Sequence, residues 1–224
     1  MKGCIFDIDG TMFLNRDYHM LAWKQCLRGP YERPFTQDEF ADHMFGPTNE
    51  SIIRWLFDGR LSREESRMLA LKKENAYQEV CRQSGGARLT DGLPAFLDAL
   101  KARGCGLAIA TGAPIGNLRF YWDLFSLDRW FDLSKAVYDD GRLPGKPDPA
   151  IYREAARRLG RAGKNCCVFE DAAPGLESAL GAGIGTVVMI DSTLERDALS
   201  AMPGVSRVIH DFADAEGLMR LLEA

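Results

Sequence analysis

The sequence predicts an α/β protein whose parallel sheet is covered by helices and interrupted by an all-helical insert. Short apolar runs that end at polar or glycine residues recur along the chain, and helical patterns separate them, as in βαβ units. Residues 17–84 break this alternation because they read as successive helices without a convincing strand. The 224 residues are 46% hydrophobic, enough to bury on the order of 70% of the unfolded surface.

The apolar runs are the expected strands. Residues 3–8 end in Asp-Ile-Asp-Gly, which suits a buried strand that leads into a loop. Further runs follow at residues 106–110, 166–169, 186–190 and, more weakly, 208–209. We therefore expect a sheet of parallel strands with right-handed crossovers.

The helices between these strands carry start and stop signals. Asp91 is expected to cap a helix over 92–103, and Gly104 follows its end. Asp148-Pro149 is expected to open a helix that stops near Gly160. A last helix is expected near 214–223.

The helical insert is predicted as a separate cap domain. Its helices are expected at about 17–28, 36–44, 48–57 and 62–83. Hinges are expected at 14–16 and 84–86, where glycines tolerate backbone rotation. We expect a Rossmann-like core formed by residues 1–14 and 88–224, and a cap formed by 15–87 that closes over the core.

Composition restricts the partners and the location. A net charge of −4 and a pI near 5.5 argue against a general attraction to nucleic acid or anionic membranes. The N-terminus lacks the long apolar stretch of a signal peptide, and no later run approaches the ~20 apolar residues of a membrane span. We expect a cytoplasmic monomer or weak dimer, with the six cysteines as buried free thiols.

Chemistry is expected where the strands end, because loops at the carboxyl ends of parallel strands form the ligand crevice. The residues at these ends include four carboxylates, one lysine, two hydroxyl groups and two glycines. They are Asp7, Asp9, Gly10, Thr11, Thr111, Gly112, Lys146, Glu170 and Asp171. Several carboxylates repel one another unless a hard cation lies between them, and oxygen ligands with room for water and phosphate suit Mg²⁺.

This set of groups fits phosphoryl transfer through a covalent intermediate. One carboxylate can attack phosphorus while the metal and the lysine neutralise charge on the equatorial oxygens. Asp9, two residues after Asp7, can give a proton to the leaving oxygen and later take one from water.

Four segments resemble the motifs of the haloacid dehalogenase superfamily, in the expected order. They are Phe6-Asp-Ile-Asp-Gly-Thr11, Ala110-Thr-Gly112, Gly145-Lys-Pro-Asp-Pro149 and Phe169-Glu-Asp-Ala-Ala-Pro-Gly175. The helical cap inserted after the first motif resembles the branch that contains β-phosphoglucomutase and phosphoglycolate phosphatase.

This resemblance implies a role for each motif residue. Asp7 would accept the phosphoryl group and bind the metal, and Asp9 would be the acid/base whose backbone carbonyl also touches the metal. Thr111, Gly112 and Lys146 would hold the phosphoryl group. Asp171 would bind Mg²⁺ directly, and Glu170 would bind it directly or through water. Asp9 argues against a dehalogenase, which in this superfamily lacks the second aspartate.

The cap carries weaker signals. The segment Tyr18-His19-Met-Leu-Ala-Trp23-Lys24 resembles the opening of the β-phosphoglucomutase cap, and Lys73 falls where that cap has a substrate-contacting lysine. His19, Trp23 and Lys73 are therefore possible substrate residues. A packed histidine, a core tryptophan and a solvated lysine remain the alternatives.

Three departures from the family pattern concern the substrate. Leu14 stands where an acidic residue is usual, and Ala113 replaces a serine or asparagine. In the loop Gly46-Pro-Thr-Asn49, Asn49 stands where the mutase has an arginine for the distal phosphate. The core chemistry is unaffected by all three.

The prediction is a Mg²⁺-dependent phosphatase that hydrolyses a small phosphorylated metabolite, such as a sugar phosphate, through an aspartyl phosphate on Asp7. The first alternative is a β-phosphoglucomutase. The second is a non-catalytic phospho-acceptor or binding module with a core like that of a response regulator, which would not need the insert, Asp9 or Lys146.

Overall fold

The computed structural model describes residues 2–44, 47–192 and 196–223. The chain divides into two compact units, one formed by residues 1–14 and 88–224 and the other by residues 15–87. We call them the core unit and the helical unit and describe each by itself.

The core unit is built on a parallel sheet with the strand order β3-β2-β1-β4-β5-β6. The strands are β1 (Gly3–Phe6), β2 (Leu107–Pro114), β3 (Val137–Asp139), β4 (Cys166–Glu170), β5 (Thr186–Ile190) and β6 (Arg207–Ile209). Chain order reverses between β1 and β4, which is where a parallel sheet opens a crevice at its carboxyl edge. The expected α/β parallel-sheet fold is confirmed.

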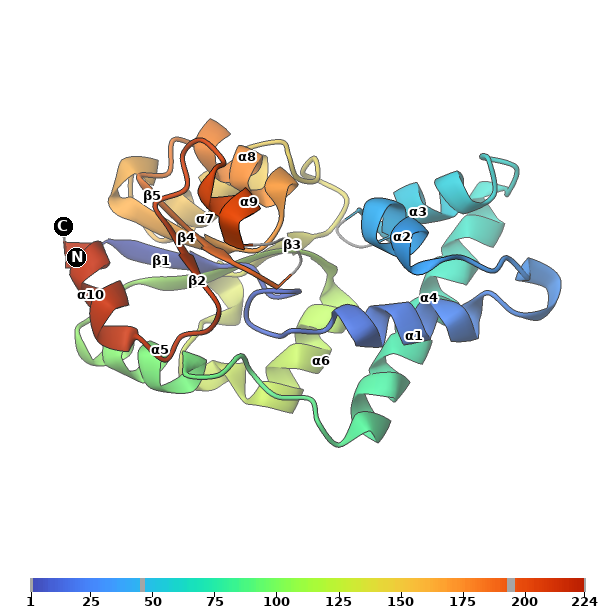
Figure 1. Cartoon of the computed structure of the whole chain (residues 1–224), viewed down its shortest axis with the longest axis horizontal. Coiled ribbons are helices and arrows are strands. Elements are labelled where there is room, and N and C mark those ends of the chain that lie inside the picture. The colour runs from blue at the N-terminus through green and yellow to red at the C-terminus, as the bar shows by residue number, and fades with distance from the viewer. Residues whose placement is uncertain (1, 45–46, 193–195, 224) are drawn as a thin grey trace. The chain divides into compact units, whose positions relative to one another are not determined.

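Helices cover both faces of this sheet (Figure 1). One face carries α5 (Leu93–Ala102), α6 (Ile115–Phe125) and α10 (Ala215–Glu223). The other carries α7 (Ala150–Arg158), α8 (Ala173–Gly181) and α9 (Arg196–Ser200). This arrangement follows from right-handed crossovers that run first toward β3 and then back toward β6.

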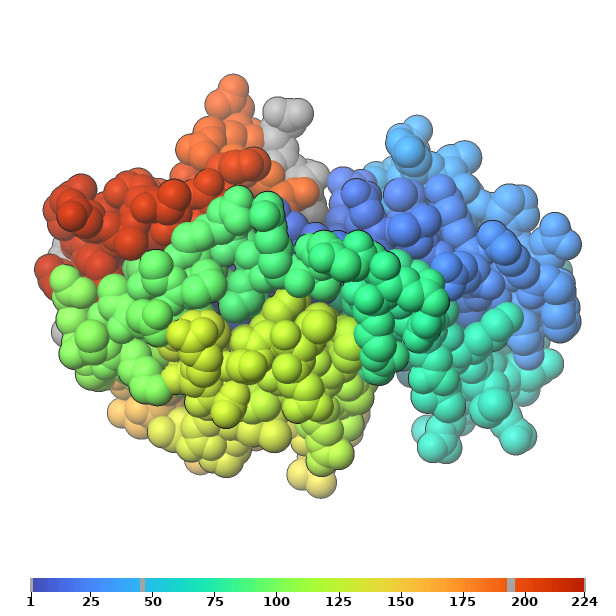
Figure 2. Space-filling model, turned by 90° about the horizontal axis from the view of Figure 1, so that it is seen from below, coloured from blue at the N-terminus to red at the C-terminus, as the bar shows by residue number. Residues whose placement is uncertain are grey.

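Aromatic rings fill the interface between the sheet and α5. Phe6 of β1 stacks on Phe169 of β4 with ring centroids 4.5 Å apart. Phe96 of α5 and Phe212, which precedes α10, pack against Phe169. All four rings are fully buried. They hold together β1, which ends just before Asp7, and β4, which ends at Glu170. Figure 2 shows the α5 segment in green beside α10 in red.

The start of α5 differs from the prediction. Asp91 does not cap this helix; its N-cap is Gly92, in the left-handed region with φ +77°. A Cβ at Gly92 would lie 2.5 Å from the backbone nitrogen of Ala213. The close approach of the segment before α10 therefore requires glycine at this turn, and Asp91 instead pairs with the exposed Arg88.

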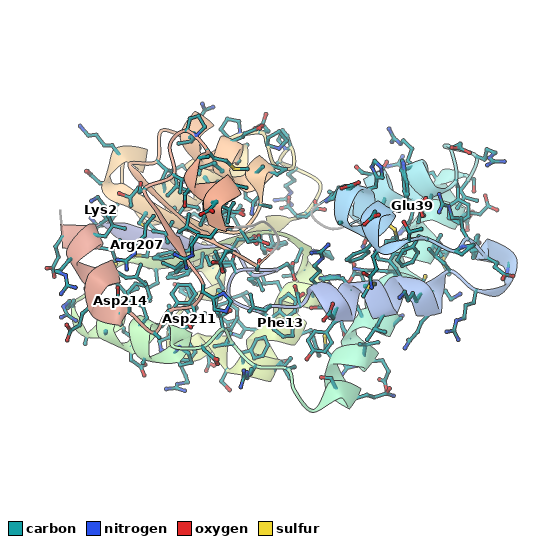
Figure 3. All side chains as sticks on the ribbon, viewed as in Figure 1. Lys2, Phe13, Glu39, Arg207, Asp211 and Asp214 are labelled. Atoms are coloured by element: carbon teal, nitrogen blue, oxygen red, sulfur yellow. The ribbon has the colours of Figure 1, made fainter. Side chains whose placement is uncertain are left out.

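The C-terminal elements are as expected. The weak strand at 208–209 is present as β6, and the last helix is α10. Arg207 of β6 forms an ion pair with Asp214, whose other carboxylate oxygen accepts a hydrogen bond from the Gly217 backbone (Figure 3). Strand β3 was not predicted, because its three residues do not form an apolar run.

The helical unit has the helices that the sequence predicts. They are α1 (Arg16–Cys26), α2 (Gln37–Glu39), which continues as the π-helix η2 (Phe40–Met44), α3 (Asn49–Leu56) and α4 (Arg63–Ser84). Ser62 and Glu65 form a capping box at the start of α4. Trp23, Phe40, Ile53 and Leu69 belong to a separate apolar core.

Short 3₁₀ turns occur at Gly29–Tyr31, Leu127–Arg129, Leu133–Lys135 and Gly163–Asn165. The expectation of buried free thiols is confirmed for all six cysteines. Among the described residues, no helix is both long and apolar enough to cross a membrane.

Candidate active site

Asp7 stands directly after β1 and is 5% exposed. Its backbone nitrogen donates a hydrogen bond to the Phe169 carbonyl at 3.1 Å, which extends the pairing of β1 with β4. The Asp7 carboxylate is therefore held beside the residues that follow β4.

Lys146 joins the ends of these two strands. Its Nζ donates to Asp7 Oδ1 at 2.8 Å and also donates to Glu170 Oε1. Burial acts to lower the pKa of Lys146, but the charges of Asp7 and Glu170 outweigh it and hold that pKa well above its usual value. Lys146 is therefore a fixed ammonium group in the site.

Glu170 is fixed from four directions. Tyr152 of α7 donates to Oε1 at 2.7 Å, alongside Lys146. The backbone nitrogens of Asp171 and Ala172 donate to Oε2 at 2.9 and 3.2 Å. Burial acts to raise the pKa of Glu170, but Lys146 and these hydrogen bonds lower it below its usual value. Both carboxylate oxygens are thus already engaged by the protein.

Asp171 completes a group of three buried carboxylates. One ligand oxygen from each of Asp7, Glu170 and Asp171 lies within 4.8 Å of the others. Burial raises the pKa of Asp7 to about 8, and it raises the pKa of Asp171 well above its usual value, with Glu170 and Asp7 adding to that shift. Keeping all three carboxylates ionised in a buried site costs free energy. A divalent cation that takes oxygen ligands would offset this cost.

The loop after β1 brings Asp9 to the same edge of the sheet. Asp9 is half-buried, and its Oδ1 accepts a hydrogen bond from the Tyr121 hydroxyl at 2.6 Å. Gly10 turns this loop with φ +78°, and a Cβ there would lie 2.0 Å from Asp171 Oδ2. The close approach of loop and carboxylate therefore requires glycine.

Thr111 and Gly112 lie near the end of β2. The Thr111 side chain is fully buried, and its Oγ1 accepts a hydrogen bond from the Ala113 backbone at 3.1 Å. Gly112 is exposed, and a Cβ there would meet no atom within 4 Å. The core unit therefore places the predicted core residues in the carboxyl-terminal halves of its strands or in the loops that follow them.

The three predicted cap residues lie together in the helical unit. His19 Nδ1 is 2.9 Å from Lys73 Nζ, and the His19 ring stacks on Tyr77 at 4.1 Å. Lys73 lies 5.8 Å from the ring of Trp23, which is 1% exposed and belongs to the apolar core of this unit. Trp23 is thus a core residue, whereas His19 and Lys73 form a polar contact.

Two further residues join this polar contact. Lys73 Nζ donates to Glu74 Oε1 at 2.9 Å, and Asn49 Nδ2 donates to the same oxygen. Burial acts to raise the pKa of Glu74, but Lys73 and His19 lower it below its usual value. Glu74 is therefore an anion that offsets the charge of Lys73. Gly46, the first residue of the loop that ends in Asn49, lies outside the described residues.

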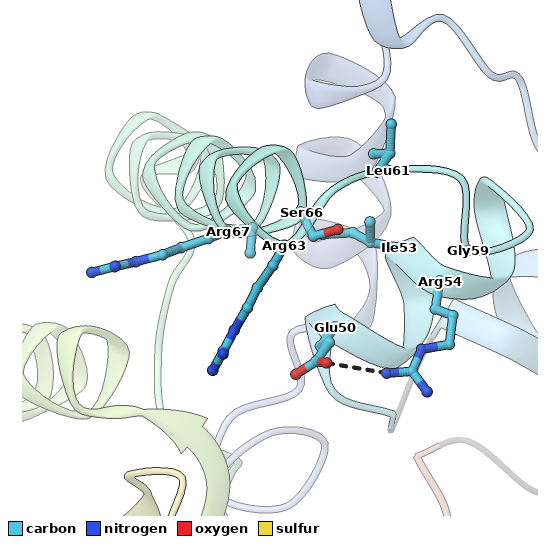
Figure 4. A pocket seen from close by; sticks show the side chains of 9 residues that line it. Glu50, Ile53, Arg54, Gly59, Leu61, Arg63, Ser66 and Arg67 are labelled. Carbon is cyan, nitrogen blue, oxygen red and sulfur yellow. Dashed lines mark hydrogen bonds and ion pairs between the residues drawn. The ribbon is translucent and has the colours of Figure 1, made fainter.

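A groove of about 590 Å³ also hollows the helical unit, between α3 and α4 (Figure 4). Arg54, Arg63 and Arg67 line it with exposed side chains, and Arg54 pairs with Glu50 across 3.2 Å. It contains none of the predicted site residues, so we assign it no part in the chemistry.

Sequence reasoning missed four residues that contact the core site. Ser192 donates to Asp171 Oδ2 at 3.0 Å and follows β5, so the rule of searching strand ends could have found it. Thr90, which donates to the Thr11 carbonyl, carries no such signal. Tyr121 and Tyr152 project from helices, and their spacing from the motifs gives no indication of a contact.

Comparison with known proteins identifies the family. Residues 1–183 match the haloacid dehalogenase-like hydrolase family. The chain belongs to that family.

Haloacid dehalogenase-like hydrolases of two activities are among its relatives. A phosphorylated carbohydrates phosphatase of Thermotoga maritima is 28% identical over 187 residues, or 82% of each chain. A β-phosphoglucomutase of Bacillus subtilis is 28% identical over 193 residues, or 84% of this chain and 82% of that one. A solved structure of a family IA, variant 3 hydrolase from Entamoeba histolytica is 31% identical, with a TM-score of 0.90 over 100% of both chains.

Proposed function

We propose that this protein is a Mg²⁺-dependent phosphatase that hydrolyses a sugar phosphate or a similarly small phosphomonoester through an aspartyl phosphate on Asp7. The observation that carries the proposal is the placement of Asp7 against Lys146 and within the group that includes Glu170 and Asp171. The relative that acts as a phosphorylated carbohydrates phosphatase supports the substrate class.

Asp7 and Asp171 are the residues that would hold Mg²⁺. Burial raises the pKa of both carboxyl groups, although Lys146 pairs with Asp7, whereas both oxygens of Glu170 are engaged by Lys146, Tyr152 and two backbone groups. We therefore infer that Glu170 fixes Lys146 and contacts the metal at most through water. When bound, Mg²⁺ would neutralise negative charge on the site and on the phosphoryl oxygens.

In the first half-reaction, an Asp7 oxygen attacks phosphorus and the bond to the leaving oxygen breaks. Asp9 gives its proton to that oxygen, so the alcohol leaves neutral. Lys146 and Thr111 hold the phosphoryl group in place and offset its charge. In the second half-reaction, Asp9 takes a proton from water as the water attacks phosphorus, which releases inorganic phosphate and restores Asp7.

The charge of the polar cluster around Lys73 favours hydrolysis over mutase chemistry. A mutase must hold a bisphosphate through two half-reactions and so needs a cationic grip on the second phosphate. Asn49 is neutral, and Glu74 already pairs with Lys73. The cluster that would have to bind a second phosphate therefore has little net positive charge. The mutase stays as the second candidate because of the Bacillus subtilis relative.

One incubation separates the two activities. The enzyme is given β-glucose 1-phosphate with Mg²⁺ and a trace of glucose 1,6-bisphosphate, while glucose 6-phosphate and inorganic phosphate are measured together. A panel of other sugar phosphates is assayed in parallel for phosphate release. We expect net release of phosphate from a monophosphate, with no need for the bisphosphate. Fast conversion to glucose 6-phosphate with little free phosphate would establish the mutase instead.

A further inference from the structure

Tyr121 contacts the side chain of Asp9 from a different segment of the core unit. Tyr121 lies on α6 and is completely buried, and its hydroxyl is 2.6 Å from Asp9 Oδ1. A phenolic hydroxyl donates readily to a carboxylate, and such charge-assisted bonds are short. The contact therefore fixes one oxygen of the proposed acid/base.

The Tyr121 ring is itself held by aromatic neighbours. Phe13 meets it edge-on with centroids 6.1 Å apart, and Phe125 of α6 stacks on it at 6.4 Å. Phe13 also closes the loop that carries Asp9, because its carbonyl accepts from the Gly10 backbone at 2.9 Å. The same packing thus determines the position of the Tyr121 hydroxyl and the path of the Asp9 loop.

We propose that Tyr121 is the positioning residue for Asp9. Its hydroxyl donates to Oδ1 and holds the carboxyl group in one rotamer, so that Oδ2 is the oxygen that carries the proton to the leaving group. The proton passes from Oδ2 to the leaving oxygen as that oxygen's bond to phosphorus breaks. This inference rests on the proposed function and assigns a role to a residue outside the four motifs.

The hydrogen bond matters for proton transfer more than for the fold. Replacing Tyr121 by phenylalanine removes one oxygen and keeps the ring contacts with Phe13 and Phe125. Asp9 then loses this hydrogen bond and samples other rotamers, which misaligns the proton donor. Because proton transfer supplies ~10²–10⁴-fold, partial loss of alignment is expected to cost about 10- to 100-fold where the leaving group needs a proton.

The test compares two leaving groups of nearly the same shape. Wild type, Tyr121→Phe and Asp9→Asn are assayed for kcat/KM with phenyl phosphate and with p-nitrophenyl phosphate, whose nitrophenolate leaves without a proton. Tyr138→Phe is the matched control, since the side chain of this half-buried tyrosine on β3 makes no hydrogen bond or ring contact within the described parts of the chain. Melting curves check that each variant is folded.

We expect Tyr121→Phe to lower kcat/KM about 10- to 100-fold for phenyl phosphate and less than about threefold for p-nitrophenyl phosphate. In the Asp9→Asn background, the same change should have no further effect, because Tyr121 acts through Asp9. The inference is overturned if Tyr121→Phe lowers kcat/KM equally for both substrates, leaves it unchanged or raises it. It is also overturned if adding Tyr121→Phe to Asp9→Asn lowers kcat/KM by the full factor seen in the single variant.

These outcomes leave the proposed function separately testable. If Tyr121→Phe behaves like wild type while Asp7→Asn and Asp9→Asn are inactive, only the role of Tyr121 fails. If wild type releases no phosphate from either aryl ester or from the sugar phosphate panel, the proposed function itself fails.

Discussion

At the scale of single residues, the site buries more carboxylate groups than ammonium groups. Asp7, Glu170 and Asp171 lie within one small volume, and Lys146 is the ammonium group that pairs with two of them. Glu170 and Asp7 share Lys146, whereas Asp171 has a hydrogen bond from the neutral Ser192. Burial raises the pKa of Asp171 well above its usual value, and the charges of Glu170 and Asp7 add to that shift, so a cation beside Asp171 would offset a costly buried charge.

We therefore predict that Asp171→Asn raises the Mg²⁺ concentration for half-maximal activity at least about tenfold, since an amide is a poorer ligand for a hard cation. The measurement is a Mg²⁺ titration of phosphate release after treatment with a chelator. Asp123→Asn, which changes an exposed acid on α6, is the control and should titrate like wild type. An unchanged titration for Asp171→Asn would remove Asp171 from the metal site.

At the scale of elements, the start of α8 is shaped around Glu170. Gly175 lies in the first turn of this helix, and a Cβ there would be 2.0 Å from Glu170 Oε1 and from its Cδ. No shift of a flexible side-chain end avoids this collision, because Tyr152, Lys146 and two backbone groups hold the carboxylate. The helix and the carboxylate can adopt these positions only with glycine.

Gly175→Ala should accordingly lower activity at least about tenfold, because a displaced Glu170 releases Lys146. It should also destabilise the protein by about 1–3 kcal/mol, the usual effect of overpacking, which is a fall in Tm of roughly 2–12 °C at this chain length. Helix propensity alone would favour alanine. Gly116→Ala on α6 is the control, since its Cβ would meet no atom within 4 Å. Wild-type activity and Tm in Gly175→Ala would contradict this account of the α8 start.

Most elements could be predicted from the sequence because their signals are local. The strands β1, β2, β4 and β5 coincide with apolar runs, and the insert has the helical periodicity that was expected. Strand β3 has three residues and depends on pairing with β2, which no local pattern reports. The prediction that Asp91 caps α5 was wrong because the segment before α10, more than 100 residues away, determines the turn at Gly92.

At the scale of the whole molecule, the parallel sheet explains why distant motifs meet. Asp7, Lys146 and Asp171 are far apart in the chain, yet the strands that they follow or adjoin share one carboxyl edge. The rule that loops gather at this edge therefore sufficed to select these residues from the sequence. It could not select Tyr121 or Tyr152, because a helix exposes many side chains and only tertiary packing decides which one reaches the site. The catalytic roles of all these residues stay predictions.

The central claim is that Asp7 becomes phosphorylated during turnover. The most direct test is to mix the enzyme and Mg²⁺ with a ³²P-labelled substrate from the sugar phosphate panel, quench with acid within one turnover, and locate the label by peptide mapping. We predict transient label on the peptide that contains Asp7, loss of that label as inorganic phosphate appears, and no label in Asp7→Asn. Release of phosphate at the wild-type rate with no label on the protein, or with label on another residue, would contradict the account.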